Sequence, residues 1–341
     1  MAKPAARLKD IADKTGFSVN TVSLALRGSS RIPPETRALI ADAARELNYL
    51  PNFVATSLVR RETRSIGLIL TDLSNPVLTA VAQAVEGELS KRGYTTLFAT
   101  SNNDIAVEEK MIETFRARRA DGMLVFPCSH RRLDHIRKLR ARNYPVVLLV
   151  GDPDAGIDAV CMDERMGAYK AVGHLLSNGH RRVVIIDGGT KLGNSEKLEG
   201  YMQAHRDAGL EIDTALFVKP SGHSVAHGYW AADTIFSQRL GASAIFATND
   251  SLALGVLRYC ARNGIRVPDD VALMGFDNIE FGEYAVTPIS TVDYNVERVS
   301  AMAVERVVDL IGAEVDLPPP RVTLIEPDLL IRQSSNSTLR S

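Results

Sequence analysis

The sequence contains little cysteine and no long hydrophobic run. Its three cysteines, Cys128, Cys161 and Cys260, are odd in number and far apart, which indicates buried reduced thiols and is consistent with a cytoplasmic protein. A membrane-spanning helix needs about 18 consecutive apolar residues, and no such run occurs. The first residues include Lys3 but no apolar core or small-residue cleavage site, so we expect no secretory signal.

The sequence motifs of several enzyme classes are also missing. There is no G-x-x-x-x-G-K-[ST] phosphate loop, no H-E-x-x-H and no G-x-S-x-G. We therefore expect a protein that is not an enzyme and that uses neither a metal nor a cofactor. With 45% hydrophobic and 24% charged residues, the chain has the composition of an ordinary globular protein. Its 341 residues suggest two or three domains, at roughly 150 residues each.

Positive charge is concentrated at one end of the chain. Residues 1–61 contain ten lysines and arginines against five aspartates and glutamates, a net charge of +5. Because the whole chain carries −1, residues 62–341 carry −6. A basic head on an acidic body is expected when only the head meets phosphates.

Residues 8–26 predict two short helices joined by a tight turn. Apolar residues at helical spacing, Ile11 and Ala12 among them, give the first helix one buried stripe. Gly16 allows a sharp turn, and Ser18 can cap the second helix by accepting a backbone hydrogen bond. This pattern is typical of a helix-turn-helix, whose second helix fits the major groove of B-DNA.

The second helix keeps mostly small and polar side chains on its outer face, because Val22 and Leu26 are expected to pack inward. Together with the basic charge, this pattern predicts sequence-specific DNA binding. A small three-helix module that binds protein is the alternative, and it explains the charge but not the helix-turn-helix pattern.

From residue 65 onwards, short apolar runs alternate with helical stretches. The predicted strands are 65–70, 95–100, 122–126, 145–150, 182–187, 215–219, 244–248 and 271–276. The predicted helices are 77–92, 107–119, 165–178, 195–208, 252–263 and 296–311, followed by an extended segment at 321–333. This alternation implies an α/β body with two doubly wound lobes, each a parallel sheet covered by helices on both faces.

Several motifs fall in a consistent order along the chain. Gly16-Phe17-Ser18-Val19-Asn20-Thr21-Val22-Ser23 is followed by Leu47-Asn48-Tyr49-Leu50-Pro51-Asn52. The body adds Asp72-Leu73-Ser74-Asn75-Pro76, Asn249-Asp250 and Gly275-Phe276-Asp277. These motifs resemble the LacI/GalR family of bacterial transcription regulators, and the resemblance runs from about residue 7 to residue 335.

The resemblance implies how the chain is divided. We expect a helix-turn-helix domain at 1–61, with a hinge helix at 52–60 that forms on operator DNA, and a body at 62–335 of the type I periplasmic-binding-protein kind. Within the body, lobe 1 is expected at about 62–162 and 293–322, and lobe 2 at about 163–292 and 323–335. The polar tail begins near Ser334 and is expected to be loose, with 336–341 flexible.

The resemblance also implies which residues of the head contact DNA. Asn20 can bind adenine through paired hydrogen bonds, and Val19 can contact a thymine methyl group. Leu24 stands where many relatives carry Arg or His, and it could instead be a core residue. Leu58 is expected to enter the minor groove as a wedge between base pairs, with a buried anchor as the alternative. The predicted DNA-binding residues are Ser18, Val19, Asn20, Thr21, Ser23, Leu24, Arg27, Asn52, Ala55 and Leu58.

An effector cleft is implied at the strand ends of the body. The predicted effector-binding residues are Ser74, Asn75, Lys197, His223, Asn249, Asp250 and Asp277. Asn249 and Asp250 could equally cap the helix that follows them. Lys197 replaces an arginine that is usual in the family, so the effector could be bound differently. We expect a small polar molecule, such as a sugar or a sugar phosphate.

The resemblance therefore predicts a transcriptional regulator, most simply a repressor, that binds a palindromic operator as a homodimer. Its partners would be operator DNA and the effector, with no membrane. An activator or a corepressor-dependent regulator is an alternative, as is a regulator triggered by a protein partner. A periplasmic-type binding protein is disfavoured by the basic head, and an enzyme by the missing motifs.

Overall fold

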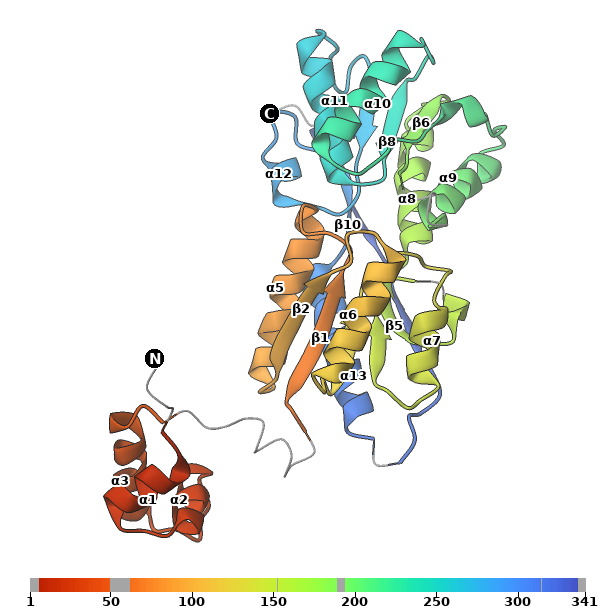
Figure 1. Ribbon diagram of the computed structural model, residues 1–341. Helices are drawn as coiled ribbons and strands as arrows, with labels where there is room; N and C mark the ends of the chain where they lie inside the picture. The colour runs from red at the N-terminus through yellow and green to blue at the C-terminus, as the bar shows by residue number, and fades with distance from the viewer. Residues whose placement is uncertain (1–5, 50–61, 152, 189–193, 314, 337–341) are drawn as a thin grey trace. The chain divides into compact units, whose positions relative to one another are not determined.

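The computed structural model describes residues 6–49, 62–151, 153–188, 194–313 and 315–336 (Figure 1). The chain forms two compact units, Met1–Thr63 and Arg64–Ser341, which we call the head and the body. Asn52, Ala55, Leu58 and the expected hinge helix at 52–60 lie outside the described residues. Within the described part of the chain, no helix combines the length and the apolar character needed to cross a membrane.

The head consists of three helices, α1 (Leu8–Thr15), α2 (Val19–Leu26) and α3 (Pro34–Glu46). Ile11, Val22 and Ile40, one from each helix, are fully buried in its core. Gly16 is the C-cap that follows α1, and its positive φ of 73° is strained for any residue with a side chain. The predicted helix-turn-helix is confirmed.

Lobe 1 is built on a six-stranded sheet in the order β11-β5-β4-β3-β1-β2, in which every neighbouring pair is parallel. Its strands are β1 (Ser65–Leu70), β2 (Thr95–Thr100), β3 (Gly122–Val125), β4 (Val146–Leu148), β5 (Asp158–Met162) and β11 (Val322–Ile325). Its helices are α5 (Pro76–Lys91), α6 (Ile105–Ala117), α7 (Asp134–Arg140) and α13 (Val296–Ile311). Buried side chains of α5 and α13 pack on one face of the sheet, and those of α6 and α7 on the other.

Lobe 2 is built on a parallel sheet in the order β7-β6-β8-β9. Its strands are β6 (Val183–Ile186), β7 (Phe217–Val218), β8 (Ala244–Ala247) and β9 (Ala272–Met274). Its helices are α8 (Glu164–Ser177), α9 (Glu196–Asp207), α10 (Val225–Ser237), α11 (Asp250–Arg262) and the short α12 (Glu280–Glu283). Helices α8 and α9 cover one face, and α10 and α11 cover the other. Antiparallel strands β10 (Thr291–Asp293) and β12 (Asp328–Leu330) form a separate pair where the chain passes between the lobes (Figure 1).

Two glycines let α10 and α11 approach closely. A Cβ atom added at Gly228 would lie 2.1 Å from the carbonyl oxygen of Leu252, and one added at Gly255 would lie 2.1 Å from that of Val225. Both contacts are with backbone, so no side-chain movement could relieve them. This close packing fixes the start of α11, which reaches the gap between the lobes.

The structure corrects the expected lobe boundary and adds strand β5, which lies outside the predicted strands. Strand β11 pairs with β5 in lobe 1, so residues 323–325 belong to lobe 1 rather than to lobe 2. Strand β5 begins at the fully buried Asp158, whose carboxylate accepts hydrogen bonds from the Nε atoms of Arg140 (2.9 Å) and Arg306 (2.8 Å). A charged residue at that position interrupts the apolar pattern from which a buried strand is recognised.

The structure also corrects the start of the loose tail. Ser334 is fully buried, and its hydroxyl donates to the carbonyl of Leu273 (2.6 Å) and accepts from the amide of Ser290 (2.8 Å). The chain is therefore anchored to lobe 2 up to this point. Small polar side chains are as compatible with such anchoring as with a loose tail, so composition alone could not distinguish them.

Candidate functional site

The first turn of α2 presents an open face on the head. Ser18 is its N-cap, and its hydroxyl oxygen accepts a hydrogen bond from the amide of Thr21 (3.1 Å). Val19 is 44% exposed and Asn20 is also exposed, so neither contributes to the core. A helix whose first turn carries exposed, uncommitted side chains can enter the major groove of DNA.

The other predicted DNA contacts surround this turn. Ser23 and Leu24 are half-buried, and Arg27 is exposed at the end of α2. Leu24 lies outside the group of side chains that form or pack against the core of the head, as far as its described residues show. Leu24 is therefore placed where it can contact a partner.

A second candidate site is a cavity of about 150 Å³ in the body, lined by residues of both lobes. Asn75 contributes from lobe 1, where it caps α5 by accepting a hydrogen bond from the amide of Val77 (3.2 Å). Asn249 contributes from lobe 2, where it caps α11 by accepting from the amide of Leu252 (2.7 Å). The cavity thus lies at strand-to-helix turns, where ligands of open α/β sheets bind.

Asp277 is a buried cavity residue in a strained backbone conformation. It is 6% exposed and has a φ of 108°, which a residue with a side chain rarely adopts. Its amide donates to the carbonyl of Val292 (2.9 Å), which holds the backbone in place. Burial raises the pKa of its carboxyl group to about 8, and only the positive charge of Lys197 opposes that rise.

Lys197 lies beside this carboxyl group and is the one lysine among the described residues that line the cavity. Its ammonium group donates to the carbonyl of Thr248 (3.0 Å), pairs with Glu164 (3.2 Å) and lies 3.9 Å from the centre of the Phe276 ring. Burial alone would lower the pKa of Lys197. The negative charges of Glu164 and Asp277 outweigh burial and raise it.

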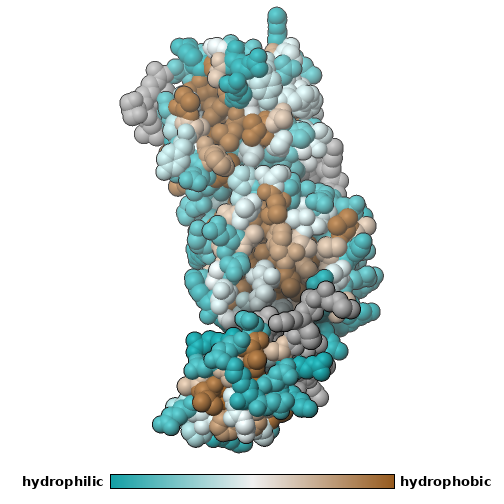
Figure 2. Space-filling view, turned by 60° about the vertical axis from the view of Figure 1, so that its left-hand side comes forward, coloured by the Kyte–Doolittle hydropathy of each residue, from teal (hydrophilic) through white to brown (hydrophobic). Residues whose placement is uncertain are grey.

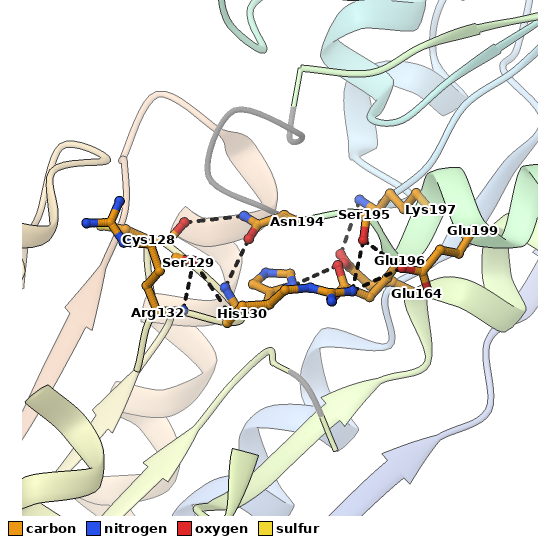
Figure 3. Close-up of polar contacts among 11 residues, drawn as sticks. Cys128, Ser129, His130, Arg132, Glu164, Asn194, Ser195, Glu196, Lys197 and Glu199 are labelled. Carbon is orange, nitrogen blue, oxygen red and sulfur yellow. Dashed lines mark hydrogen bonds and ion pairs between the residues drawn. The ribbon is translucent and has the colours of Figure 1, made fainter. Parts of the chain in front are cut away.

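Polar contacts join the loop after β3 in lobe 1 to the first turn of α9 in lobe 2 (Figure 3). His130 donates its amide to Asn194 Oδ1 (2.9 Å), and its Nδ1 lies 2.9 Å from Glu196 Oε2. Arg131 Nη2 lies 3.1 Å from Glu199 Oε1. We call these five residues the interlobe latch. The latch holds the two lobes together beside the cavity.

The charges of the latch reinforce each other. Burial opposes protonation of His130, but the hydrogen bond to Glu196 and the charges of Glu164 and Glu196 raise its pKa overall. Burial raises the pKa of Glu196, but the hydrogen bond and charge of His130 lower it overall. The pair is therefore favoured in its charged form.

The latch also brings possible metal ligands together. Ligand atoms of His130, Glu164 and Glu196 lie within 4.8 Å of one another, so this trio is the described group that could hold a metal ion. Two of its members form the His130–Glu196 pair, and Glu164 is paired with Lys197. The cluster is thus already accounted for by ion pairs within the protein.

Models of known protein families match both the head and the body. Residues 7–52 match the family model described as bacterial regulatory proteins, lacI family, and residues 172–335 match the periplasmic binding protein-like domain. The HTH-type transcriptional repressor PurR of Pasteurella multocida (strain Pm70) is 31% identical over 337 residues, which cover 98% of this chain and 100% of that protein. The chain belongs to the lacI family.

Another regulator and two solved structures are also similar to this chain. The HTH-type transcriptional regulator DegA of Bacillus subtilis (strain 168) is 30% identical over 86% of this chain and 87% of its own length. The crystal structure of the Lac repressor dimer bound to operator and the anti-inducer ONPF has a TM-score of 0.87 at 21% identity, covering 97% of this chain and 99% of that one, which shows the fold. A complex of the transcriptional regulator CelR with cellobiose has a TM-score of 0.71 at 27% identity. The match covers 97% of this chain and 100% of that one.

Membership of the lacI family makes the protein a DNA-binding transcriptional regulator, not an enzyme. The two-lobed α/β fold is confirmed as well. The open face of α2 lies in the part of the chain that matches the lacI family model, and the cavity lies between the two lobes of the body.

The structure separates the predicted effector residues into two groups. Asn75, Lys197, His223, Asn249 and Asp277 line the cavity. Ser74 does not, because it is exposed and its hydroxyl donates to Asp72 (2.7 Å); it lines a neighbouring groove that His223 also lines.

Asp250 is a correction, because it lies behind the cavity wall instead of in it. Its carboxylate is fully buried and accepts hydrogen bonds from the amides of Phe276 and Ile279 (2.9 Å each) and from the hydroxyl of Thr291 (2.8 Å). These contacts fix the loop that carries Asp277. The dipeptide pattern could not show which of its two side chains faced the ligand.

Several residues of the cavity and the latch were not predicted from the sequence. Asp187 lies at the end of a predicted strand and Asp72 precedes a predicted cleft residue, so their positions alone could have indicated the cavity. His130 and Glu196 carry no such signal. They are 66 residues apart, and they meet only because the lobes fold against each other.

Proposed function

We propose that this protein represses transcription by binding a palindromic DNA site as a homodimer, and that a small polar effector held between the lobes changes its affinity for that site. The observation that carries the proposal is a cavity whose polar groups come from both lobes. A molecule bound there stabilises one arrangement of the lobes over another, which is the requirement for coupling two sites. The named complexes of relatives with operator, ONPF and cellobiose support the same scheme.

The first turn of α9 is the element through which we expect the coupling to pass. Lys197 points to the cavity, where it contacts Thr248 and Glu164, while its neighbour Glu196 holds His130 of lobe 1. A ligand that moves Lys197 therefore also moves Glu196. The turn joins effector binding to the closure of the two lobes.

An exposed apolar surface supports the homodimer. Phe281, Tyr284 and Val286, on and after α12, are 65%, 77% and 103% exposed. Figure 2 turns the side of the body that bears α5 and α12 towards the viewer, and apolar side chains gather there in both lobes. Contiguous exposed apolar patches mark association surfaces. Association through the body would present two heads to a palindrome.

DNA selection tests the proposed function directly. A random duplex library enriched on the full chain should yield a palindromic site, and its affinity, measured by fluorescence anisotropy, should fall steeply as salt rises. A matched duplex with one scrambled half-site should bind more weakly. Failure to prefer any palindrome over random fragments would contradict the proposal.

The hinge residues can be tested although they lie outside the described part of the chain. We expect Leu58→Ser to weaken operator binding and to leave the body folded, because the hydrophobic wedge between base pairs would be lost. Arg27→Ala would serve as a comparison, since it should remove a phosphate contact and lower the salt dependence instead. Unchanged operator affinity of Leu58→Ser in a gel shift would show that this leucine is not a wedge.

A further inference from the structure

Carboxylates outnumber cations among the described residues that line the cavity. Its lining includes Asp72, Glu164, Asp187, Glu196 and Asp277. Among the described residues that line it, Lys197 is the one lysine, and none is an arginine. A cavity of about 150 Å³ has room for roughly five water molecules or a ligand of monosaccharide size, so these charges are crowded around one small molecule.

Most of the carboxylates have a partner within the protein. Glu164 is paired with Lys197 (3.2 Å), and Glu196 with His130 (2.9 Å). Asp72 accepts hydrogen bonds from the hydroxyl and the amide of Ser74 (2.7 and 2.8 Å). These groups need nothing from a ligand.

Asp277 differs from the other carboxylates. Its side chain is not part of any hydrogen bond or ion pair within the described residues, although it is 94% buried and lines the cavity. A buried carboxyl group without a partner is costly, and its strained backbone is of a kind found at functional sites. A bound molecule can supply the missing partner.

Lys197 has little capacity left for an anionic ligand. An ammonium group has three donors, and this one is engaged by Thr248 and Glu164 while it lies against the Phe276 ring. A phosphate or carboxylate in the cavity would meet the carboxyl groups of Asp277 and the other acids, and no lysine or arginine among the described lining residues is free to balance it. The cavity is therefore unfavourable for a sugar phosphate.

We propose that the effector carries an ammonium group that pairs with Asp277, as an amino sugar would, and this inference rests on the effector function proposed for the cavity. A neutral sugar could also donate a hydroxyl to Asp277. It would supply no positive charge, whereas an ammonium group allows this buried carboxyl group to ionise and pairs with the carboxylate that forms.

Calorimetric titration of the full chain with matched sugars tests this inference. Glucosamine, galactosamine and mannosamine would each be compared with the neutral parent, the N-acetyl derivative and the 6-phosphate. We expect one amino sugar to bind at least tenfold more tightly than its three counterparts. Acetylation keeps the ring and removes only the charge, so it isolates the ammonium group.

Two variants assign the contact. Asp277→Asn should remove the preference for the amine, while Asp134→Asn, which alters an 86% exposed carboxylate on α7, should leave it unchanged. Tighter binding of a neutral sugar or a phosphate would overturn the ammonium inference, and the proposed effector function would stand. If no sugar in the panel bound, the inference would be rejected, and the proposed function would be judged separately by the selection of palindromic DNA.

Discussion

Replacing Glu196 by glutamine tests whether the latch closes the body in solution. The change keeps the shape of the side chain and removes its charge. Glu196 and His130 are largely buried, with side chains 18% and 5% exposed, so their 2.9 Å contact is only weakly screened by water. A hydrogen bond between charged groups contributes about 1.5–3 kcal/mol to stability, and one between uncharged groups about 0.5–1.5 kcal/mol.

The contribution of the His130–Glu196 pair to the stability of the body should depend on pH in a defined direction. The pKa of His130 is raised above the ordinary 6.5, so its stabilising effect is complete below 6.5 and is lost as pH rises through the raised value. The pKa of Glu196 is lowered below the ordinary 4.5, so its effect is complete above 4.5 and is lost only as pH falls below that. The latch is therefore strongest between these two ordinary values.

Urea unfolding at pH about 5.5 and about 9 measures this dependence. Trp230 is the single tryptophan and lies on α10, so its fluorescence reports the body and not the head. We expect Glu196→Gln to lower the free energy of unfolding by about 1.5–3 kcal/mol at the lower pH and by about half as much or less at the higher one.

Glu199→Gln is the matched control, one turn along the same helix. Its partner Arg131 stays charged at both pH values, and both side chains are well exposed (38% and 53%), so the loss should be about 0–1 kcal/mol and independent of pH. An equal loss for Glu196→Gln at both pH values, or one no larger than that of the control, would refute the stabilising role of the His130–Glu196 pair in the latch.

Three further predictions concern the glycine contact, the cavity and the head. Gly228→Ala should destabilise the body by about 1–3 kcal/mol in urea unfolding, since its Cβ would strike backbone, whereas Gly87→Ala, with nothing within 4 Å, should stabilise it slightly. In the ligand-free protein, Asp277→Asn should raise stability increasingly between pH 3.8 and about 8, because the raised pKa makes the native carboxyl group costly to ionise; an unchanged pH profile would contradict this. Asn20→Ala should reduce discrimination between the selected site and an adenine-substituted one by about 1–3 kcal/mol in anisotropy titrations, and equal weakening on both duplexes would show that Asn20 does not read a base.

The fold was predictable wherever the pattern was local. Strands β1 and β2 have the predicted bounds, because their apolar runs end at clear turn residues. Strand β5 was not predicted, because it begins at Asp158. The burial of that carboxylate depends on Arg306, which is 148 residues away in the chain. No local pattern contains that partner.

The candidate site divides in the same way. Asn75, Asn249 and Asp277 follow strands, so their position at the sheet edge could be inferred from the sequence. The latch could not be inferred from the sequence, because its two sides come from different lobes. The sequence also could not show that Lys197 is already paired with Glu164, the contact on which the argument against a sugar phosphate depends.

The energies of these contacts set limits on how the effector can act. Moving a two-state equilibrium from almost fully open to almost fully closed takes about 5.5 kcal/mol. The His130–Glu196 bond can supply about 1.5–3 kcal/mol of this where both groups are charged. It would bias the lobes without fixing them. The remaining energy must come from groups that gain a partner only when a molecule binds, and Asp277 is the described cavity residue that has most to gain.

Above the pKa of His130 the latch contributes less to closure, so the same effector would have to supply more of the closure energy. The part of the effector affinity that depends on the latch should then fall as pH rises, which would tie the proposed control of DNA binding to both the ligand and the protonation of one histidine.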